Sequence, residues 1–273
     1  MNRHLARANL LNAVRLVVAG LEDIGIPALK GRDHREPGWR EKEAYENKLR
    51  FQIVKHFGKQ RRNIREKLTS SRKKLDYDDD FFTDEELEEA LIRILKDAAK
   101  DGILLFGKKG LPQINYDLVN EEAAEWADNY VFDLIKDINK VSSEQLDNMQ
   151  DIFNDFVETP GMTIGDVMDQ LTMFSEDRAQ RIAVTEITRT YAKAHQIAGD
   201  EMKKEFPDVK VIKIWYTNND DLVCEFCGPL NGTEVEVNEN FYDIEDAYQD
   251  GNPPQHVNCR CWMETTTDIL AGE

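Results

Sequence analysis

The sequence lacks any apolar run near the roughly 18 residues that a membrane-spanning helix needs, so we do not expect a membrane protein. Arg15 interrupts the apolar stretch near the N-terminus, and no small-residue cleavage site follows it. This pattern favours an amphipathic helix over a signal peptide. Internal repeats and low-complexity tracts are also absent. A chain of 273 residues can bury a core without disulfides or metal, so any metal site should be a local feature.

The N-terminal part of the chain has few acidic residues, and the rest of the chain has few basic residues. The net charge is -18, but residues 1–75 hold 19 Lys and Arg against 8 Asp and Glu, which gives +11. Residues 76–273 hold 16 basic against 45 acidic residues, or -29. This asymmetry predicts a basic arm that meets DNA or an acidic partner, and an acidic body that repels free DNA. A solvated basic helix without such a partner is the alternative.

Helical periodicity covers most of the chain. Leu49, Ile53 and Phe57 mark a basic amphipathic helix within residues 40–75. Thr83 and Glu86 form a capping box for a helix from about residue 84 to 100, which we expect to end at a glycine, Gly102. Further helices are predicted over residues 120–139 and 143–157, in a short segment that opens at Thr163, and from about Ser175 to just before Pro207.

Short β-like segments follow at residues 209–217, 233–237 and 259–267. The fold class predicted is mainly α (α+β), a helical body with a small C-terminal β-rich element that zinc stabilises. We expect a basic helical arm over residues 1–75 and an acidic linker and helix over 76–117. The remaining domain, 118–273, would comprise a helical part, 118–206, and a β-rich Cys/His element, 207–267.

All four cysteines lie in the last fifth of the chain. Cys224 and Cys227 form a CEFC turn, and PPQHVNCRC carries His256, Cys259 and Cys261. A Cys-x-x-Cys turn with a second pair from the HxxC or CxC part would complete a tetrahedral zinc site, so five candidate ligands compete for four places. A disulfide between the two turns and unligated thiols are the alternatives. No histidine follows His256, which disfavours a nuclease of the His-Asn-His type.

Glu186 falls within the apolar stripe of the long helix that begins near Ser175. An unpaired buried charge costs several kcal/mol, so we expect the carboxylate to have a partner. We predict a structural ion pair between Glu186 and Arg260, which would fasten the β-rich element to the helix. Glu186 reaching solvent at the edge of the stripe, or serving as a catalytic glutamate, are the alternatives.

Three motifs carry a resemblance: RIAVTEITRTYAKA, IWYTNNDDLVCEFCGPLNGTEV and PPQHVNCRC. In this order they resemble the head morphogenesis (minor head protein) family of tailed bacteriophages, typified by protein F of phage Mu, over roughly residues 118–266. The family pattern has a Thr-Glu helix, matched by Thr185 and Glu186, a strand with tryptophan, matched by Trp215, and the two Cys turns. Val257 stands where the family usually has proline.

The resemblance implies a minor head protein that acts in head assembly at the portal vertex and in DNA packaging or delivery. It implies partners among the portal, capsid and scaffold proteins, and a place in the virion, inside the capsid near the portal. The charge asymmetry adds packaged DNA, reached through the basic arm, as a further expected partner. Assembly in the host cytoplasm would keep thiols reduced, which favours zinc over a disulfide. No enzymatic activity is implied. The alternative is a metal-dependent nuclease or an ADP-ribosyltransferase-like enzyme that uses the Cys/His cluster or Glu186.

Overall fold

The computed structural model describes residues 32–70, 85–107, 114–139, 143–218, 220–244 and 250–267. The chain divides into two compact units, Met1–Arg32 and Asp33–Glu273. The elements named below all lie in the second unit. Thr83, from the predicted capping box, lies outside the described residues.

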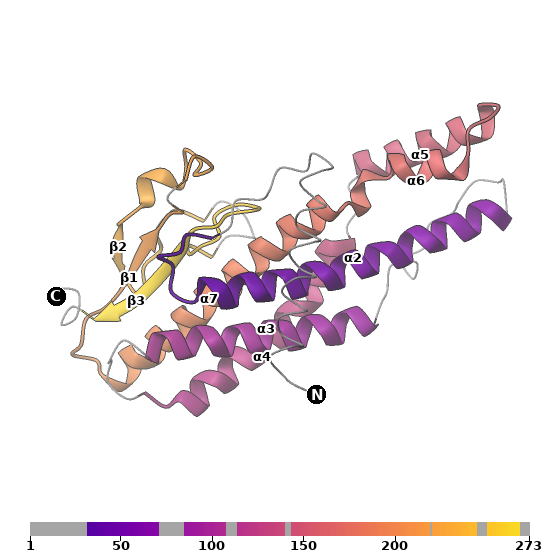
Figure 1. Cartoon of the computed structure of the whole chain (residues 1–273). Coiled ribbons are helices and arrows are strands. Elements are labelled where there is room, and N and C mark those ends of the chain that lie inside the picture. Colours follow the sequence, from indigo (N-terminus) through magenta and orange to yellow (C-terminus); the bar gives the residue numbers. More distant parts are fainter. Residues whose placement is uncertain are drawn as a thin grey trace, which may run out of the picture. The chain divides into compact units, whose positions relative to one another are not determined.

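Most described residues are helical (Figure 1). The helices are α2 (Trp39–Ser70), α3 (Glu85–Gly107), α4 (Tyr116–Asn139), α5 (Ser143–Glu158), α6 (Ile164–Gln170) and α7 (Glu176–Glu205), with a 3-10 turn at Thr172–Phe174. Thr163 caps α6 with a capping box, and Ser175 caps α7 by accepting from the backbone N–H of Arg178. The helices predicted from residue 120 onwards are therefore confirmed within a few residues at their ends.

A small antiparallel sheet follows the helices. Its strands are β1 (Val211–Tyr216), β2 (Glu234–Glu236) and β3 (Trp262–Thr267), in the order β2-β1-β3. The register pairs Ile212 with Glu236 and Trp215 with Met263. The sheet packs against the C-terminal half of α7, whereas α5 and α6 lie at the other end of the helical part (Figure 1). A mainly α fold with a small C-terminal β-rich element is thus confirmed.

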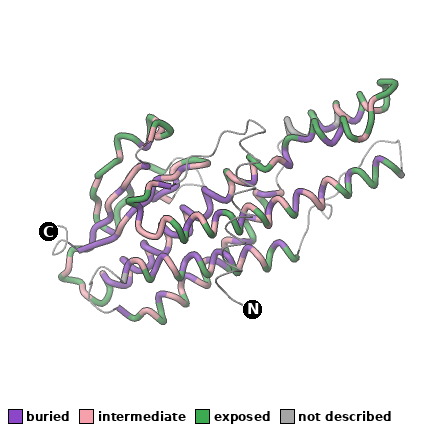
Figure 2. Tube along the Cα trace, in the orientation of Figure 1, coloured by how far each residue is buried: buried purple, intermediate pink, exposed green. Residues whose placement is uncertain are grey.

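Helix α7 contributes to all three hydrophobic clusters of the core. Ile187 and Tyr191 pack with α2, α3 and α4, and Ala198 packs with apolar residues of α3, α4 and the sheet. Ala192 packs with Trp215 in a cluster that also holds three of the cysteines. Buried residues follow one another with few breaks along the middle of α7, whereas buried and exposed residues alternate along α2, α3 and α4 (Figure 2). The Thr-Glu motif therefore lies on the most buried of the described helices, against which part of the cysteine cluster packs.

Gly102 does not end its helix, which corrects the boundary predicted from the sequence. Helix α3 continues to Gly107. A Cβ atom built at Gly102 would lie 2.9 Å from the Cβ of Ala194, so the glycine allows α3 and α7 to approach closely. Packing between the two helices outweighs the loss of about 1 kcal/mol that glycine costs inside a helix.

The described part of the predicted basic arm is built into the helical bundle instead of standing apart from it. Leu49, Ile53 and Phe57 of α2 are buried in the same cluster as residues of α3 and α7. Lys55 and Lys59 both donate to the Glu86 carboxylate of α3. Part of the basic charge of α2 is therefore neutralised within the protein.

Lys213 links the sheet to α7. Its ammonium group is buried and donates to Gln196 Oε1 of α7 at 3.0 Å and to Asn252 Oδ1 at 2.9 Å. Burial lowers the pKa of Lys213 to about 8, although Asp200 and Asp250 oppose this shift. The amide oxygens thus compensate in part for the loss of water around the cation.

Gly199 should be intolerant of a side chain. A Cβ atom there would lie 2.8 Å from Val237 Cγ2 and 2.9 Å from Thr265 Cγ2, both in the sheet region. We predict that Gly199→Ala lowers the free energy of unfolding by about 1–3 kcal/mol, because α7 would be pushed off the sheet. The measurement is chemical denaturation of the full chain.

Gly58→Ala is the matched control, since Gly58 also lies inside a helix but a Cβ there would meet only Arg62 Nη1, at 3.7 Å. This variant should be neutral or more stable by up to about 1 kcal/mol. Equal stability of the two variants would contradict the close contact inferred at Gly199.

Candidate metal centre

The CEFC turn follows strand β1 and has a metal-knuckle geometry. The backbone N–H of Cys227 points to Cys224 Sγ at 3.3 Å, and the N–H of Gly228 donates to the Cys224 carbonyl at 3.0 Å. The turn runs into a short 3-10 helix, η3 (Gly228–Leu230). Cys227 is buried, while Cys224 is partly exposed. Both sulfurs are thus presented on the same side of the turn, as one bound ion would require.

Helix α7 holds the second turn in place. Thr185 Oγ1 accepts from the backbone N–H of Asn258 at 2.8 Å, and Thr188 Oγ1 donates to the Cys259 carbonyl at 3.1 Å. Asn258 adopts a φ of 63°, a left-handed conformation that asparagine tolerates better than most residues. The Thr-Glu motif of α7 therefore has a direct role in placing His256 and Cys259.

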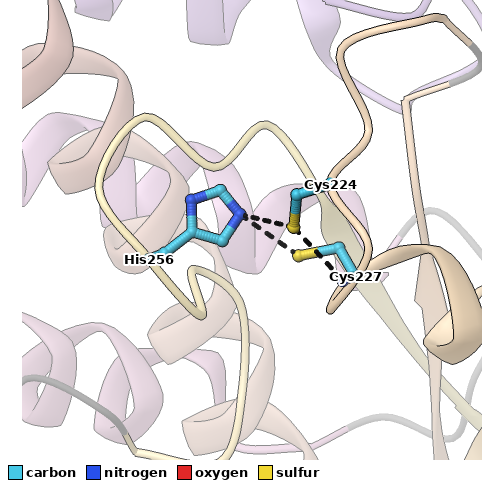
Figure 3. Close-up of side chains that lie close together, drawn as sticks. All are labelled: Cys224, Cys227 and His256. Atoms are coloured by element: carbon cyan, nitrogen blue, oxygen red, sulfur yellow. Dashed lines mark hydrogen bonds between the residues drawn. The ribbon is translucent and has the colours of Figure 1, made fainter.

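The two turns bring the His256 imidazole beside the Cys224 and Cys227 thiols (Figure 3), and Cys259 lies next to Cys227. His256 Nε2 lies 3.2 Å from Cys224 Sγ and 3.4 Å from Cys227 Sγ, and Cys227 Sγ lies 3.8 Å from Cys259 Sγ. His256 Nδ1 lies 2.9 Å from the Val257 carbonyl oxygen. An Nδ1–H that donates to this oxygen leaves the Nε2 lone pair directed at the sulfurs, the tautomer that a metal ligand needs.

Three of the distances in the cluster are near those expected between the ligands of a tetrahedral metal ion. Zinc bonds of about 2.3 Å to sulfur and about 2.0 Å to nitrogen place neighbouring ligand atoms roughly 3.5–3.8 Å apart. The distances of 3.2, 3.4 and 3.8 Å in the cluster lie close to this range. The ligand atoms fall into two groups that share Cys227, one with Cys224 and His256 and one with Cys259 and Cys261. The cluster could therefore hold a metal ion. All four cysteines are free thiols, so no disulfide joins the two turns.

The electrostatics of the cluster also suit a cation. Hydrogen bonds from the Cys227 and Cys261 thiols, together with the nearby His256, lower the pKa of Cys259 far below its usual value. Burial works against the charge on Cys224, but backbone N–H groups and His256 outweigh it and lower the pKa of that thiol too. Burial likewise opposes protonation of His256, yet Cys259 and Cys224 raise its pKa. Negative charge on the sulfurs thus gathers beside His256, where a bound cation would be stabilised.

Arg260 pairs with Asp220 and not with Glu186, which corrects the ion pair predicted from the sequence. Its Nη1 lies 2.8 Å from Asp220 Oδ2, and its Nη2 donates to Asp220 Oδ1 at 3.0 Å. Cys259 and Cys261 on either side of Arg260 are both buried, and the arginine side chain itself is only 10% exposed. The bidentate pair ties the CRC segment to the chain just before the CEFC turn.

Glu186 is buried, as predicted, but its partners lie on α4 and on its own helix. Tyr130 donates its hydroxyl to Glu186 Oε2 at 2.6 Å, and Arg189 Nε lies 3.4 Å from the same oxygen. Burial raises the pKa of Glu186, and Arg189 and Tyr130 offset part of that rise. An arginine three residues later on a helix is a recognisable sequence signal. Nothing in the local sequence identifies Tyr130, which comes from a separate helix.

Comparison with known protein families identifies this part of the chain. Residues 135–264 match the family described as phage Mu protein F like protein. In this region the chain is similar to the phage Mu protein F-like family. The resemblance seen in the sequence motifs is thereby confirmed. No curated protein and no solved structure matched the chain.

The Mu F-like region begins within α4, ends within β3 and includes all five candidate ligands. The family suggests a phage head morphogenesis protein that is associated with the virion and with other head components. Such a structural and morphogenetic role is consistent with a protein that is not an enzyme. None of the described helices carries an apolar stretch that could cross a membrane.

Separate roles for buried Glu186 and partly buried Asp220 can be tested with Glu186→Gln and Asp220→Asn. We predict that Glu186→Gln lowers the free energy of unfolding by roughly 3 kcal/mol, because buried Arg189 loses its counter-charge, but leaves metal affinity unchanged. Asp220→Asn should instead weaken zinc binding by about tenfold, because Arg260 no longer holds the CRC segment beside the CEFC turn. Zinc titration and denaturation of both variants provide the measurement. A loss of zinc affinity in Glu186→Gln alone would reverse these assignments.

Proposed function

We propose that the chain is a minor head protein of a tailed bacteriophage, acting in head assembly at the portal vertex. The observation that carries the proposal is the match of residues 135–264 to the phage Mu protein F-like family. This region includes the two cysteine turns, which contact each other, and α7, which binds the second turn. The proposed partners are the portal protein and the capsid or scaffold proteins. The proposed location is the capsid interior near the portal.

We propose further that zinc is a structural component of this protein. The proposed ligands are Cys224, Cys227, His256 and Cys259. The charges of Cys224 and Cys259 raise the pKa of His256, which places both sulfurs near the imidazole, and Cys227 Sγ lies beside Cys259 Sγ. Cys259 and Cys261 both belong to the group that contains Cys227 but neither Cys224 nor His256. We take Cys261 as the spare residue because Cys259 is the thiol whose charge acts most strongly on His256. With four protein ligands, zinc would have no open position for water or substrate and would act as a structural cross-link.

The basic arm provides the proposed route to packaged DNA. On the described part of α2, Arg62 and Arg65 near the helix end are exposed, while the basic residues nearer its middle pair with α3. Cations at a helix end can neutralise phosphates without contact from the acidic body. Binding of DNA through this arm would fall steeply as salt concentration rises.

The enzymatic alternative assigned catalysis to the Cys/His cluster or to Glu186. The structure favours other roles for both. The Glu186 carboxylate accepts a hydrogen bond from Tyr130 and pairs with Arg189 inside the protein, so its role is to link α4 to α7. The cluster offers more thiol and imidazole ligands than a closed zinc site needs, which suits a structural ion.

Single Cys→Ser substitutions test the zinc site. We predict that the full chain binds one zinc ion and that Cys224→Ser, Cys227→Ser and Cys259→Ser each lose most of it, because each removes one of four thiolate or imidazole ligands. Cys261→Ser should retain one zinc per chain. Elemental analysis after dialysis gives the stoichiometry. Zinc loss in Cys261→Ser with retention in Cys259→Ser would exchange the roles of these two residues.

Incorporation into phage heads tests the functional proposal. The full chain would be co-expressed with the head genes of the same genome, and particles would be purified on a density gradient. We predict that the chain co-purifies with the particles and can be cross-linked to the portal protein. Particles assembled without the portal gene are the control and should lack the chain. A chain that is absent from complete particles, or present at equal levels in both kinds, would contradict a portal-vertex role.

A further inference from the structure

Exposed apolar side chains gather around the two cysteine turns. Leu222, Phe226 and Val257 are 59%, 66% and 66% exposed. Most other large exposed apolar residues, such as Phe51 on α2 and Phe132 on α4, lie on helices, and Ile244 lies in the loop between β2 and β3. Scattered exposed apolar residues are ordinary on a protein surface, whereas a group at one point usually marks an interaction site.

These three residues, which we call the clasp tip, belong to one surface. Leu222 and Phe226 are each two positions from Cys224, and Val257 follows His256 directly. Cys224 Sγ and His256 Nε2 are 3.2 Å apart, so the two turns that carry the tip face one another (Figure 3). The bidentate pair of Arg260 with Asp220 fixes the same two segments. A surface held in this way loses little conformational entropy on binding.

The charged side chains in the two segments that carry the clasp tip are mostly acidic. Asp221 and Glu225 are exposed next to Leu222 and Phe226. Arg260 is the one Lys or Arg among the described residues 220–232 and 250–261, and it is paired with Asp220. An acidic rim repels DNA and also repels the same tip of a second copy. It attracts a protein surface that carries Lys or Arg.

We propose that the clasp tip is the docking surface for another head protein, one that offers an apolar pocket flanked by Lys or Arg. This inference rests on the proposed function in the phage head. Phe226 is the anchor, since a large exposed aromatic ring gains most from entering an apolar pocket. Glu225 contributes the complementary charge at the rim. The metal ligands hold the surface rigid and are not themselves contacted by the partner.

The test uses the full chain, co-expressed with the head genes of its genome. The copies of the chain per purified particle are measured for the wild type, Phe226→Ser and Glu225→Lys. Phe132→Ser is the matched control, since Phe132 is 61% exposed but lies on α4. Zinc content and thermal unfolding of each free variant show that the fold is retained. We expect Phe226→Ser and Glu225→Lys to reduce incorporation at least tenfold and Phe132→Ser to match the wild type.

Each other outcome overturns a specific statement. Wild-type incorporation of Phe226→Ser would show that the clasp tip is not the docking surface, while the role of the chain in the head would stand. Equal losses in Phe226→Ser and Phe132→Ser would also overturn the inference, because any exposed apolar side chain would then matter. Absence of the wild-type chain from particles would overturn the proposed function, and with it the head protein inferred as partner.

Discussion

The C-terminal element depends on the close packing of its thiols against the His256 imidazole. Three sulfurs and one ring nitrogen lie within 3.2–3.8 Å of their nearest neighbours. Cys227, Cys259 and Cys261 are buried, and negative charge on a buried sulfur must be shared with a proton or a cation. This requirement joins segments that are 32 residues apart in the chain. The small sheet has only three strands, so these contacts supply much of what orders the loops around it.

Helix α7 lets the helical part and the C-terminal element act as one structure. Thr185 and Thr188 bind the loop that carries His256 and Cys259. The next position after Thr185 turns toward α4, where Glu186 meets Tyr130. Further along the helix, Gly199 allows the sheet to approach. The Thr-Glu pair of the family motif thus fastens two different neighbours, one with each residue.

Charge has different roles in the basic helix α2 and at the acidic clasp tip. Lysines of α2 pair with Glu86 of α3, so part of the positive charge stabilises the bundle instead of facing a partner. At the clasp tip the acids are exposed beside apolar side chains. The first arrangement suits a structural helix whose end remains basic, and the second suits recognition of a protein. The charge asymmetry of the sequence therefore does not translate directly into one DNA-binding half and one inert half.

The sequence by itself determined the mainly helical fold, the position of the sheet and the group of candidate ligands. Periodicity, caps and Cys-x-x-Cys spacing act over a few residues, so they can be read along the chain. Only the tertiary structure decided that Gly102 lies against Ala194, that Arg260 pairs with Asp220 and that Tyr130 reaches Glu186. These contacts join residues between 40 and 92 positions apart. They depend on how whole helices and loops pack, because close packing selects which side chains meet.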